Sequence, residues 1–466
     1  MTDSDDTARP FRLCIIGSGP AAFYAAEHAL KQTAQRFEVD MLDRLPTPYG
    51  LVRGGVAPDH QKIKSVIAVY EKIAALPGFR FFGNVEFGKH VTRADLEKHF
   101  HAILFATGAQ TDRRLGIPGE NLAGSHSATE FVAWYNGHPD FRDRTFDLTQ
   151  ERAAVIGVGN VAIDVARILC HPSSVLERTD MADPAIAALS ESRVRDVWIL
   201  GRRGPVQAAF TNQEVKELGE LPETDLIVEP KEVEIDPISA AELAASGRSA
   251  HQAKVDILQG FSKRTPEGRP RRLHLRFFVS PLEILGDAAG HVRALRLARN
   301  RLEVDAAGRV SAVPTGEEET LEVGLVFRSV GYRGVALPDV PYDAKAGVIP
   351  NAKGRVLGGN GLAAPGLYVS GWIKRGPSGV IGNNKADSVE TVNALIEDAA
   401  AGALPRPAEP SPEAFERLLS SRQQDLVTFG HWKRLDRIEC ERGAPAGRPR
   451  VKMTSVEEML DALAEK

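Results

Sequence analysis

Blocks of apolar residues predict a strand, a helix and a second strand within the first 45 residues. Residues 11–16 form an apolar run that predicts a buried strand, and small and apolar residues then recur at helical spacing to about Leu30. A second apolar run at residues 37–42 ends immediately before Asp43. This order of elements predicts a βαβ-type unit at the start of the chain.

The turn between the first strand and the helix has the pattern G-x-G-x-x-A. Gly17 allows a tight turn, Gly19 lets the backbone approach a pyrophosphate, and Ala22 lets the helix pack closely on its strand. Phosphates would bind the N–H groups at the helix start, and Asp43 would accept hydrogen bonds from the ribose of an adenine dinucleotide. We expect Pro20 and Ala21 to line the same site.

The same pattern returns about 140 residues later, where the apolar run 153–156 leads into Gly157, Gly159 and a helix that begins with Asn160 and Val161. A single glycine-rich turn is weak evidence, because such turns are common and most bind nothing. Two copies are far less probable by chance. They predict two nucleotide-binding domains of Rossmann type, and therefore an α/β fold with two dinucleotide sites.

The second copy differs from the first at the end of its next strand. The run 197–200 leads into Gly201, Arg202 and Arg203 instead of an acidic residue. A carboxylate at this position would bind a bare ribose, whereas guanidinium groups suit the added charge of a 2′-phosphate. The second site is therefore predicted to prefer NADP over NAD.

Glycine- and proline-rich segments follow both predicted strands of the first unit. Residues 45–60 predict a long loop that could lie against a flat ligand, with an amphipathic helix after it at 62–76. Further strands are predicted at 80–85 and 101–106, the latter ending near Gly108. We expect Gly50, Leu51 and Val85 to contribute to the first site.

The last third of the chain is predicted to return to the first domain. Residues 326–332 have the pattern of a strand that makes this return, and residues 366–372 predict another strand. A glycine-rich loop at 373–385 and a helix at 386–398 come next, and their order again predicts a site for an electron-rich group. The residues after a linker at 402–412 are predicted to be a helical appendage.

Composition indicates a globular protein without a nucleic-acid or membrane partner. The 466 residues are 43% hydrophobic and 26% charged, and the formal net charge is -4. The uncharged stretch 356–373 contains several glycines and a proline, so it predicts turn and strand rather than a membrane span. The polar, acidic first ten residues resemble neither a secretory signal nor a transit peptide.

The three cysteines, Cys14, Cys170 and Cys440, are far apart and form no C-x-x-C pair. The spacing therefore predicts no disulfide framework, no redox-active dithiol, no iron–sulfur ligand set and no other metal site. Cys14 lies inside an apolar strand and is expected to be a small core residue. This use of cysteine suits a reducing, cytoplasmic compartment.

Taken together, these motifs resemble adrenodoxin reductase and the bacterial ferredoxin–NADP reductases of the same type. The loop at 48–60 and the loop that begins at Trp372 are the most specific parts of the match. The resemblance extends from about residue 11 to residue 400. The residues that carry it are 17–20, 48–60, 81–85, 106–108, 159–162 with Asp164, 201–205 and 372–384.

The resemblance implies an FAD-binding domain formed by residues 1–109 and 330–466, with an NADP-binding domain of residues 110–329 inserted into it. It also implies the activity of a ferredoxin–NADP(+) reductase, in which a hydride passes between NADPH and FAD and single electrons then pass to an iron–sulfur protein such as ferredoxin. We expect a monomer, without metal ligands of its own.

The same resemblance implies roles for individual residues. Trp372 would pack beside the flavin, the backbone of Gly379 would reach the polar edge of the ring, and Asp43 would hold the FAD ribose. His60 and Asp164 would lie near the nicotinamide. The further cofactor contacts that it implies are Gly108, Val380 and Ile381 for FAD, and Asn160, Val161, Arg202, Arg203 and Glu214 for NADP.

Ferredoxins of this kind are usually acidic, so basic residues are candidates for their docking. The sequence offers a cluster from Lys263 to Arg276, although such runs are more often solvated surface, and it also offers Lys374 and Arg375 beside the predicted flavin site. The full cluster is Lys263, Arg264, Arg269, Arg271, Arg272 and Arg276.

Two other functions remain open at this point. One is a nucleotide-sensing protein that is not an enzyme, and the other is an NADPH-dependent flavin oxidase or monooxygenase-like protein. Thioredoxin and glutathione reductases are disfavoured because the dithiol is missing. The small subunit of glutamate synthase is disfavoured because it carries cysteine-ligated clusters and has a Gly-Asp pair where this chain has Gly371 and Trp372.

Overall fold

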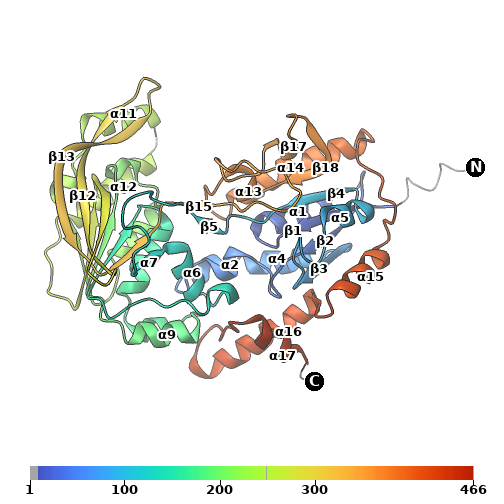
Figure 1. Ribbon diagram of the computed structural model, residues 1–466, viewed down its shortest axis with the longest axis horizontal. Coiled ribbons are helices and arrows are strands. Elements are labelled where there is room, and N and C mark those ends of the chain that lie inside the picture. The colour runs from blue at the N-terminus through green and yellow to red at the C-terminus, as the bar shows by residue number, and fades with distance from the viewer. Residues whose placement is uncertain (1–8, 248, 465–466) are drawn as a thin grey trace, which may run out of the picture. The chain divides into compact units, whose positions relative to one another are not determined.

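The computed structural model describes residues 9–247 and 249–464, and the chain forms two compact units (Figure 1). One unit combines Met1–Thr111 with Tyr332–Lys466, and the other is Asp112–Gly331. The second unit is therefore inserted into the sequence of the first. The short strands β5 (Thr111–Asp112) and β15 (Tyr332–Arg333) mark the two crossings. No helix among the described residues is long and apolar enough to cross a membrane.

The unit formed by the two ends of the chain is built on an eight-stranded sheet in the order β16-β17-β18-β4-β1-β2-β3-β19. Its five central strands, from β18 to β3, are parallel, and the outer ones are antiparallel. The strands are β1 (Phe11–Ile16), β2 (Phe37–Leu42), β3 (Phe79–Gly83), β4 (Ala102–Phe105), β16 (Asn351–Ala352), β17 (Arg355–Leu357), β18 (Ala363–Val369) and β19 (Val427–Thr428).

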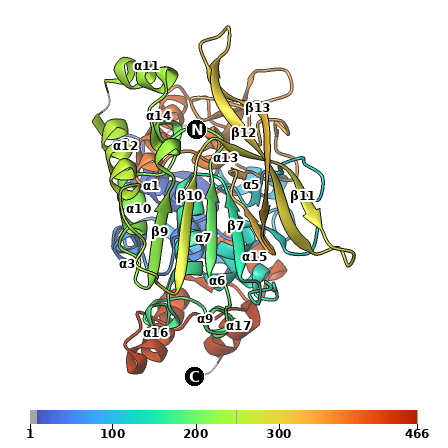
Figure 2. The ribbon, with the colours of Figure 1, turned by 90° about the vertical axis from the view of Figure 1, so that its left-hand side faces the viewer.

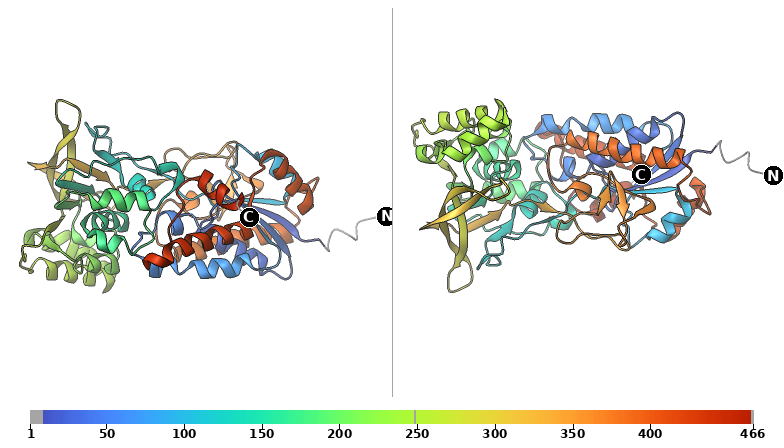
Figure 3. Two further views of the ribbon diagram at one scale, coloured as in Figure 1. Left: turned by 90° about the horizontal axis from the view of Figure 1, so that it is seen from below. Right: turned by 90° about the horizontal axis from the view of Figure 1, so that it is seen from above.

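Helices α1 (Pro20–Leu30) and α14 (Asn383–Ala400) lie side by side on this sheet, drawn in blue and orange in Figure 3. The hydroxyl of Ser388 on α14 donates a hydrogen bond to the Ala21 carbonyl on α1 (2.9 Å). The other helices of the unit are α2 (Leu51–Gly54), α3 (Gln61–Lys64), α4 (Ile67–Ala74), α5 (Arg93–His99), α13 (Trp372–Arg375), α15 (Pro412–Arg422), α16 (Phe429–Gly443) and α17 (Val456–Ala464).

Three expectations about this unit were wrong in detail. The helix predicted at 62–76 is divided into α3 and α4. The helix predicted from residue 386 begins at Asn383, about one turn earlier, and Trp372 starts the short helix α13 instead of a loop. Each difference lies at an element end, where local hydrogen bonds and tertiary packing override sequence pattern.

The inserted unit contains a six-stranded sheet in the order β6-β14-β7-β8-β10-β9, and all of its strands are parallel. Continuous apolar runs such as β7 are typical of strands covered on both faces. Figure 2 shows β9, β10 and β7 in this sheet. The strands are β6 (Ser125–Ser127), β7 (Arg152–Ile156), β8 (Asp196–Leu200), β9 (Thr224–Val228), β10 (Arg271–Arg276) and β14 (Leu325–Arg328).

The strand predicted to return to the first domain, at 326–332, is β14 and belongs to the inserted unit instead. It pairs with β6 and β7. The buried residues of β14 complete the core of the inserted unit, and an apolar run cannot tell which of two sheets it joins. The helices here are α6 (Ala128–Tyr135), α7 (Asn160–Cys170), α8 (Ser173–Leu176), α9 (Asp183–Ser190), α10 (Asn212–Leu218), α11 (Pro237–Ser246) and α12 (Ser249–Phe261).

A separate antiparallel sheet of three strands extends the inserted unit. It consists of β11 (Val279–Gly286), β12 (Val292–Val304) and β13 (Val310–Glu322), with the long β12 in the middle (Figure 2). β11 starts three residues after β10 ends, so the turn between them joins the two sheets.

Candidate functional site

The first glycine turn forms a cradle between β1 and the start of α1. Gly17 has φ +102°, and a Cβ there would lie 2.5 Å from the Ala106 carbonyl oxygen, so only glycine fits. A Cβ on Gly19 or Gly108 would meet no atom within 4 Å. Within the described residues, no side chain caps α1, whose N-cap is Gly19. The start of α1 therefore has no side-chain acceptor among the described residues and leaves room beside Gly19, as a phosphate site requires.

Asp43, which follows β2, holds this turn. One of its carboxylate oxygens accepts hydrogen bonds from the backbone N–H and the hydroxyl of Ser18 (3.0 and 2.5 Å). The other oxygen accepts the N–H of Leu45 (3.0 Å), and the Asp43 carbonyl accepts the N–H of Val85 (2.8 Å). Burial raises the pKa of Asp43 despite these bonds. Further donors, such as ribose hydroxyls, would stabilise its charged form.

The loop after Asp43 approaches the same turn in a strained conformation. Tyr49 has φ +85° and its N–H donates to the Ser18 carbonyl (2.9 Å). Gly50 comes so close that a Cβ there would lie 3.0 Å from the Gly19 Cα. Leu51, which begins α2, is one of the exposed large apolar side chains. The loop thus brings both backbone and an apolar surface to the cradle.

Helix α16, in the C-terminal part of the chain, fixes this loop. The Trp432 indole donates to the Tyr49 hydroxyl (3.3 Å) across an edge-to-face ring contact. The guanidinium of Arg53 lies over the Trp432 ring and makes two hydrogen bonds to the buried Glu439 (2.8 and 2.5 Å). The pattern had predicted only a helical appendage, but this segment closes the loop on its cradle.

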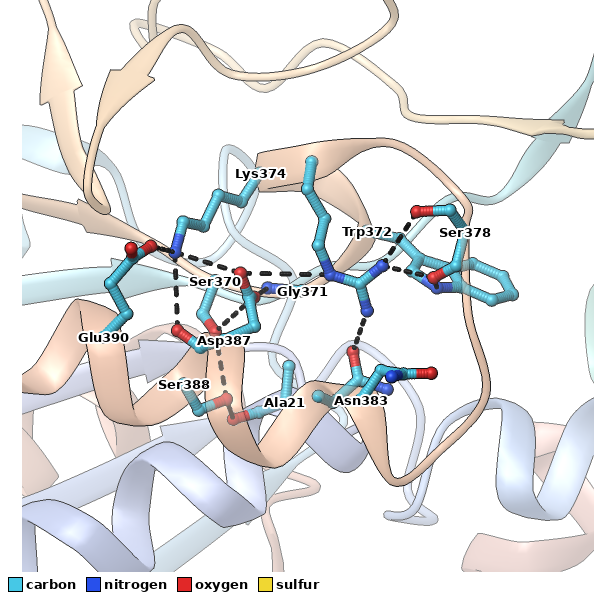
Figure 4. Close-up of polar contacts among 12 residues, drawn as sticks. Ala21, Ser370, Gly371, Trp372, Lys374, Ser378, Asn383, Asp387, Ser388 and Glu390 are labelled. Atoms are coloured by element: carbon cyan, nitrogen blue, oxygen red, sulfur yellow. Dashed lines mark hydrogen bonds and ion pairs between the residues drawn. The ribbon is translucent and has the colours of Figure 1, made fainter. Parts of the chain in front are cut away.

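β18 ends at Val369, and Ser370 and Gly371 connect it to Trp372, the first residue of α13 (Figure 4). Gly371 has φ +80° and lies against Ala21, because a Cβ there would be 2.7 Å from the Ala21 Cβ. The Trp372 indole N–H donates to the Ser378 carbonyl (3.2 Å), and its ring packs on Tyr332 at a centroid distance of 5.4 Å. These contacts fix the ring plane of Trp372.

The glycine-rich loop after α13 is braced from α14. The carboxylate of Asp387 accepts the Gly371 N–H (2.5 Å) and pairs with the ammonium of Lys374 (3.0 Å) (Figure 4). Arg375 donates to the Ser378 carbonyl and to Asn384 (3.0 Å).

Gly379 lies at the tip of this loop with φ +78°. The side chain of Asn383 accepts the Val380 N–H (2.8 Å), while the Val380 side chain is 53% exposed and Ile381 is half-buried. At the tip, a side chain at position 379 would collide with Asn383, and the next residue, Val380, is apolar and exposed.

The expected docking role of Lys374 was wrong. Its side chain is 6% exposed, and its ammonium group pairs with Asp387 and Glu390 (2.7 Å). An ammonium group that is buried and neutralised twice cannot attract a partner in solution. The sequence did not indicate this, because Asp387 and Glu390 lie on the next helix and meet Lys374 only in the folded chain.

The second glycine turn, between β7 and α7, repeats the first cradle. Gly157 has φ +132°, and a Cβ there would lie 2.1 Å from the Ser329 carbonyl oxygen. A Cβ on Gly159, like one on Gly19, would meet no atom within 4 Å. Asn160 begins α7 and accepts the Thr211 N–H through its side-chain oxygen (2.9 Å). Val161 follows Asn160 and is partly buried against the core.

Arg202 and Arg203 follow β8 at the carboxyl edge of the parallel sheet. Arg202 is exposed and Arg203 is half-buried. Among the described residues, neither guanidinium group makes a hydrogen bond or an ion pair with a protein side chain. Burial and then the neighbouring Arg202 lower the pKa of Arg203. Glu242 is near enough to raise the pKa of Arg203 slightly, but it forms no ion pair with either arginine among the described residues. Two adjacent cations of this kind are suited to bind an anion.

Asp164 and Glu214 are linked by a residue that the pattern did not single out. Arg167, one turn after Asp164 on α7, is 3% exposed and pairs with Asp164 (3.0 Å), Glu214 (3.3 Å) and Glu217 (3.0 Å). Arg167 therefore ties α7 to α10 through ion pairs with all three carboxylates. His60 is the N-cap residue of α3 in the other unit and is half-buried.

Most of the predicted basic cluster is neutralised. Arg276 pairs with Glu232 and Glu319, Arg272 pairs with Asp196, and Arg269 pairs with Glu267. Asp196 comes from β8, which pairs with β10, and Glu232 and Glu319 come from other parts of the folded unit. A linear charge count cannot reveal these pairs, although Glu267 is a near neighbour of Arg269 in sequence. Within the described residues, Lys263 and Arg264 are the members without an acidic partner. Both are exposed.

Comparison with known proteins gives consistent results. The family model described as pyridine nucleotide-disulphide oxidoreductase matches residues 11–196. NADPH-ferredoxin reductase FprA of Mycobacterium tuberculosis is 48% identical over 97% of this chain and 99% of its own length. The human mitochondrial NADPH:adrenodoxin oxidoreductase is 43% identical over 97% and 92%. The solved structure of M. tuberculosis FprA in complex with NADPH covers 98% of this chain and 100% of its own, with a TM-score of 0.92 and 47% identity.

The chain belongs to the NADPH–ferredoxin and adrenodoxin reductase family. The resemblance drawn from its motifs is confirmed, and so is the α/β fold with Rossmann-like domains. Members of this family are oxidoreductases. The family fold is present over nearly the whole chain, including the C-terminal segment that holds the loop after Asp43.

Several residues of this family site were missed in the sequence. Arg167 and Glu439 are buried, Asp387 is half-buried, and all three are charged residues that organise other site residues. Each was inconspicuous because it lies in an amphipathic helix, where a charged residue predicts a solvated face. A charge at an otherwise apolar helical position, as Arg167 has within α7, is the one signal that could have found them.

Proposed function

We propose that this chain is an FAD-dependent NADPH–ferredoxin reductase. In this proposal the unit of residues 1–111 and 332–466 binds FAD, and the unit of residues 112–331 binds NADPH. When bound, FAD supplies a carrier that accepts a hydride from NADPH and releases electrons one at a time to an iron–sulfur protein. The observation that carries the proposal is that Arg202 and Arg203, which form no ion pair among the described residues, follow β8 beside the open glycine turn after β7. The chain is also similar throughout its length to reductases of this kind.

The residues of the first cradle fit FAD. The open space beside Gly19 and Gly108 would admit a pyrophosphate, and Asp43 has spare acceptor capacity for the ribose hydroxyls. Trp372, whose ring plane is fixed by Ser378, would pack beside the flavin. The chain's own contribution is thus to bind the cofactor, orient its ring and exclude water from it. The remaining FAD contacts that we propose are Gly17, Pro20, Ala21, Gly50, Leu51, Val85, Gly379, Val380 and Ile381.

The residues of the second cradle fit NADPH. Arg202 and Arg203 would bind the 2′-phosphate, and the open space beside Gly159 would admit the pyrophosphate. Asp164, held in place by its ion pair with Arg167, would lie near the nicotinamide and orient it. The other contacts that we propose are His60 near the nicotinamide, and Asn160, Val161 and Glu214 elsewhere on NADPH.

The electron acceptor is proposed to be an acidic ferredoxin-like protein. The exposed Lys263 and Arg264, and Arg375 beside the flavin loop, are the basic residues that support this part of the proposal. The rate of ferredoxin reduction should fall steeply as ionic strength rises. A rate that does not change between low and high salt would contradict an electrostatic docking surface. A monomer in the cytoplasm is proposed as the working form.

The decisive experiment is anaerobic titration of the purified protein with NADPH. We expect a yellow protein whose visible absorbance bleaches on addition of one equivalent and recovers when an oxidised ferredoxin is added. NADH at the same concentration serves as the control and should act much more slowly. A protein that stays colourless with excess FAD would refute the proposal and favour a nucleotide sensor. Rapid oxygen use with product hydroxylation would favour a monooxygenase.

A further inference from the structure

The segment that carries Arg202 and Arg203 is held through its main chain by residues of β11, β12 and the turn before β11. Each of the three carbonyl oxygens of residues 201–203 accepts a hydrogen bond from outside the segment. The donors are the N–H of Val279 to Gly201 (3.0 Å), the side-chain amide of Asn300 to Arg202 (2.9 Å) and the N–H of Phe278 to Arg203 (3.3 Å). Two of these donors are backbone groups, so only the bond from Asn300 depends on a particular side chain.

Asn300 is built into this position. It lies in β12 where the pairing with β13 shifts register, it is 8% exposed, and its own N–H donates to the Phe278 carbonyl (2.8 Å). Its amide nitrogen contacts the Arg202 carbonyl and the Ser280 hydroxyl (2.7 Å). Among the described residues, its amide oxygen has no hydrogen-bond partner. The hold on Arg202 therefore depends on the NH₂ group of Asn300 alone.

Phe278 contributes from the turn between β10 and β11. It has φ +57°, which is rare for a side chain of this size, and a Cβ on Gly204 would lie 2.7 Å from its ring. This conformation directs the Phe278 N–H to Arg203 and its carbonyl to Asn300. A strained residue persists only where its surroundings determine it, and here the surroundings are the arginine segment and Asn300.

We propose that Asn300 is a positioning residue for recognition of the 2′-phosphate. This inference rests on the proposed function of Arg202 and Arg203 as the phosphate site. Two neighbouring arginines repel one another, so their side chains converge on one phosphate only if the backbone is held. Asn300 supplies that hold from the three-stranded sheet, which gives the sheet a role in coenzyme selectivity. Loss of the amide donor should weaken binding of 2′-phosphorylated nucleotides and spare other adenine nucleotides.

The test is calorimetric titration of the full-length, FAD-loaded protein with 2′,5′-ADP and, separately, with 5′-ADP. In Asn300→Leu and Asn300→Ser, we expect affinity for 2′,5′-ADP to fall about tenfold, which corresponds to one lost hydrogen bond, and affinity for 5′-ADP to change less than about twofold. Ser280→Ala is the matched control. It removes the other contact of the same amide without touching the arginine segment, and should leave both affinities within about twofold of the wild type.

The outcomes separate this inference from the proposed function. If the wild-type protein does not prefer 2′,5′-ADP to 5′-ADP, the phosphate assignment itself is wrong. If the wild type has that preference and both Asn300 variants retain it, only the role of Asn300 is refuted. Equal losses for both nucleotides would also refute it, because they indicate a general disturbance. Should Asn300→Leu fail to fold, the smaller Asn300→Ser decides.

Discussion

Replacement of Glu439 by glutamine tests whether the C-terminal helix holds the loop that we propose to contact FAD. Glu439 is 1% exposed, and its carboxylate accepts four hydrogen bonds. Two come from Arg53 on the loop (2.8 and 2.5 Å), one from Arg450 (3.3 Å) and one from the N–H of Met453 (2.9 Å). Glutamine keeps the shape of the side chain, removes its charge and turns an NH₂ group toward a guanidinium.

The expected loss follows from the burial of the pair. Removal of one partner of a buried ion pair costs about 3–5 kcal/mol, because the other charge stays buried without compensation. Glutamine retains one acceptor oxygen, so we expect Glu439→Gln to lower the free energy of unfolding by about 3 kcal/mol. Arg53 lies only four residues after Tyr49, whose positive φ needs the contact with Trp432. In Glu439→Gln the loop should therefore open more readily, and FAD should be released at a lower urea concentration than from the wild-type protein.

The assay is urea unfolding, followed by far-UV circular dichroism and by the fluorescence of released flavin. Glu441→Gln is the control, because Glu441 lies on the same helix, loses the same charge and has only an exposed contact to Arg437 at 3.9 Å. This control should change stability by less than about 0.5 kcal/mol. If Glu439→Gln lowers the free energy of unfolding no more than Glu441→Gln does, the stabilising contact between Glu439 on α16 and Arg53 is refuted.

Three further predictions concern the other sites. Arg202→Ala with Arg203→Ala should raise the KM for NADPH roughly 10- to 100-fold and that for NADH less than about twofold, and equal loss for both would refute the phosphate assignment. Burial acts to raise the pKa of Asp95, but hydrogen bonds from Arg422 and Thr92 lower it overall. The ionised Asp95 therefore stabilises the fold above the ordinary aspartate pKa of about 4, and this stabilisation is lost as the pH falls below that value. Asp95→Asn should therefore lower the free energy of unfolding by roughly 1–2 kcal/mol at pH 7, and the difference from the wild type should become smaller in acid. A difference in unfolding free energy that does not change with pH would contradict this. His60→Ala should slow flavin reduction by NADPH in stopped flow if His60 transfers a proton, and an unchanged rate removes that role.

Local pattern was sufficient for the parts of the fold that obey a short-range rule. The G-x-G-x-x-A turns require glycine because a Cβ at Gly17 or Gly157 would collide with the carbonyl of Ala106 or Ser329, each of which follows a strand that neighbours the turn in its sheet. The glycine pattern that meets this requirement is visible in the sequence. Strands β1, β2 and β8 were predicted within one residue because apolar runs between turn residues mark buried parallel strands. The predicted role of Arg202 and Arg203 rests on their place after such a strand, and it stays a prediction.

The sequence pattern was least successful in predicting which charged residues remain exposed and unpaired. Lys374 and Arg276 look like surface cations in the sequence, yet each is paired with acids that come from other elements. The assignment of β14 failed for a related reason, since its apolar residues suit either sheet equally. Long-range pairing decides which charges remain available and which sheet a strand joins, and neither depends on the neighbours in sequence.

The sequence by itself determined that this protein has two nucleotide cradles and that the second is suited to a phosphorylated ribose, because a tight turn and a strand end are formed by adjacent residues. Only the tertiary structure decided how those cradles are held. Glu439 reaches Arg53 across 386 residues of sequence, and Asn300 reaches the Arg202 carbonyl across 98. Such bonds form only after the sheets have assembled, since side chains this far apart in sequence come within 3 Å only when the packing of whole elements brings them together.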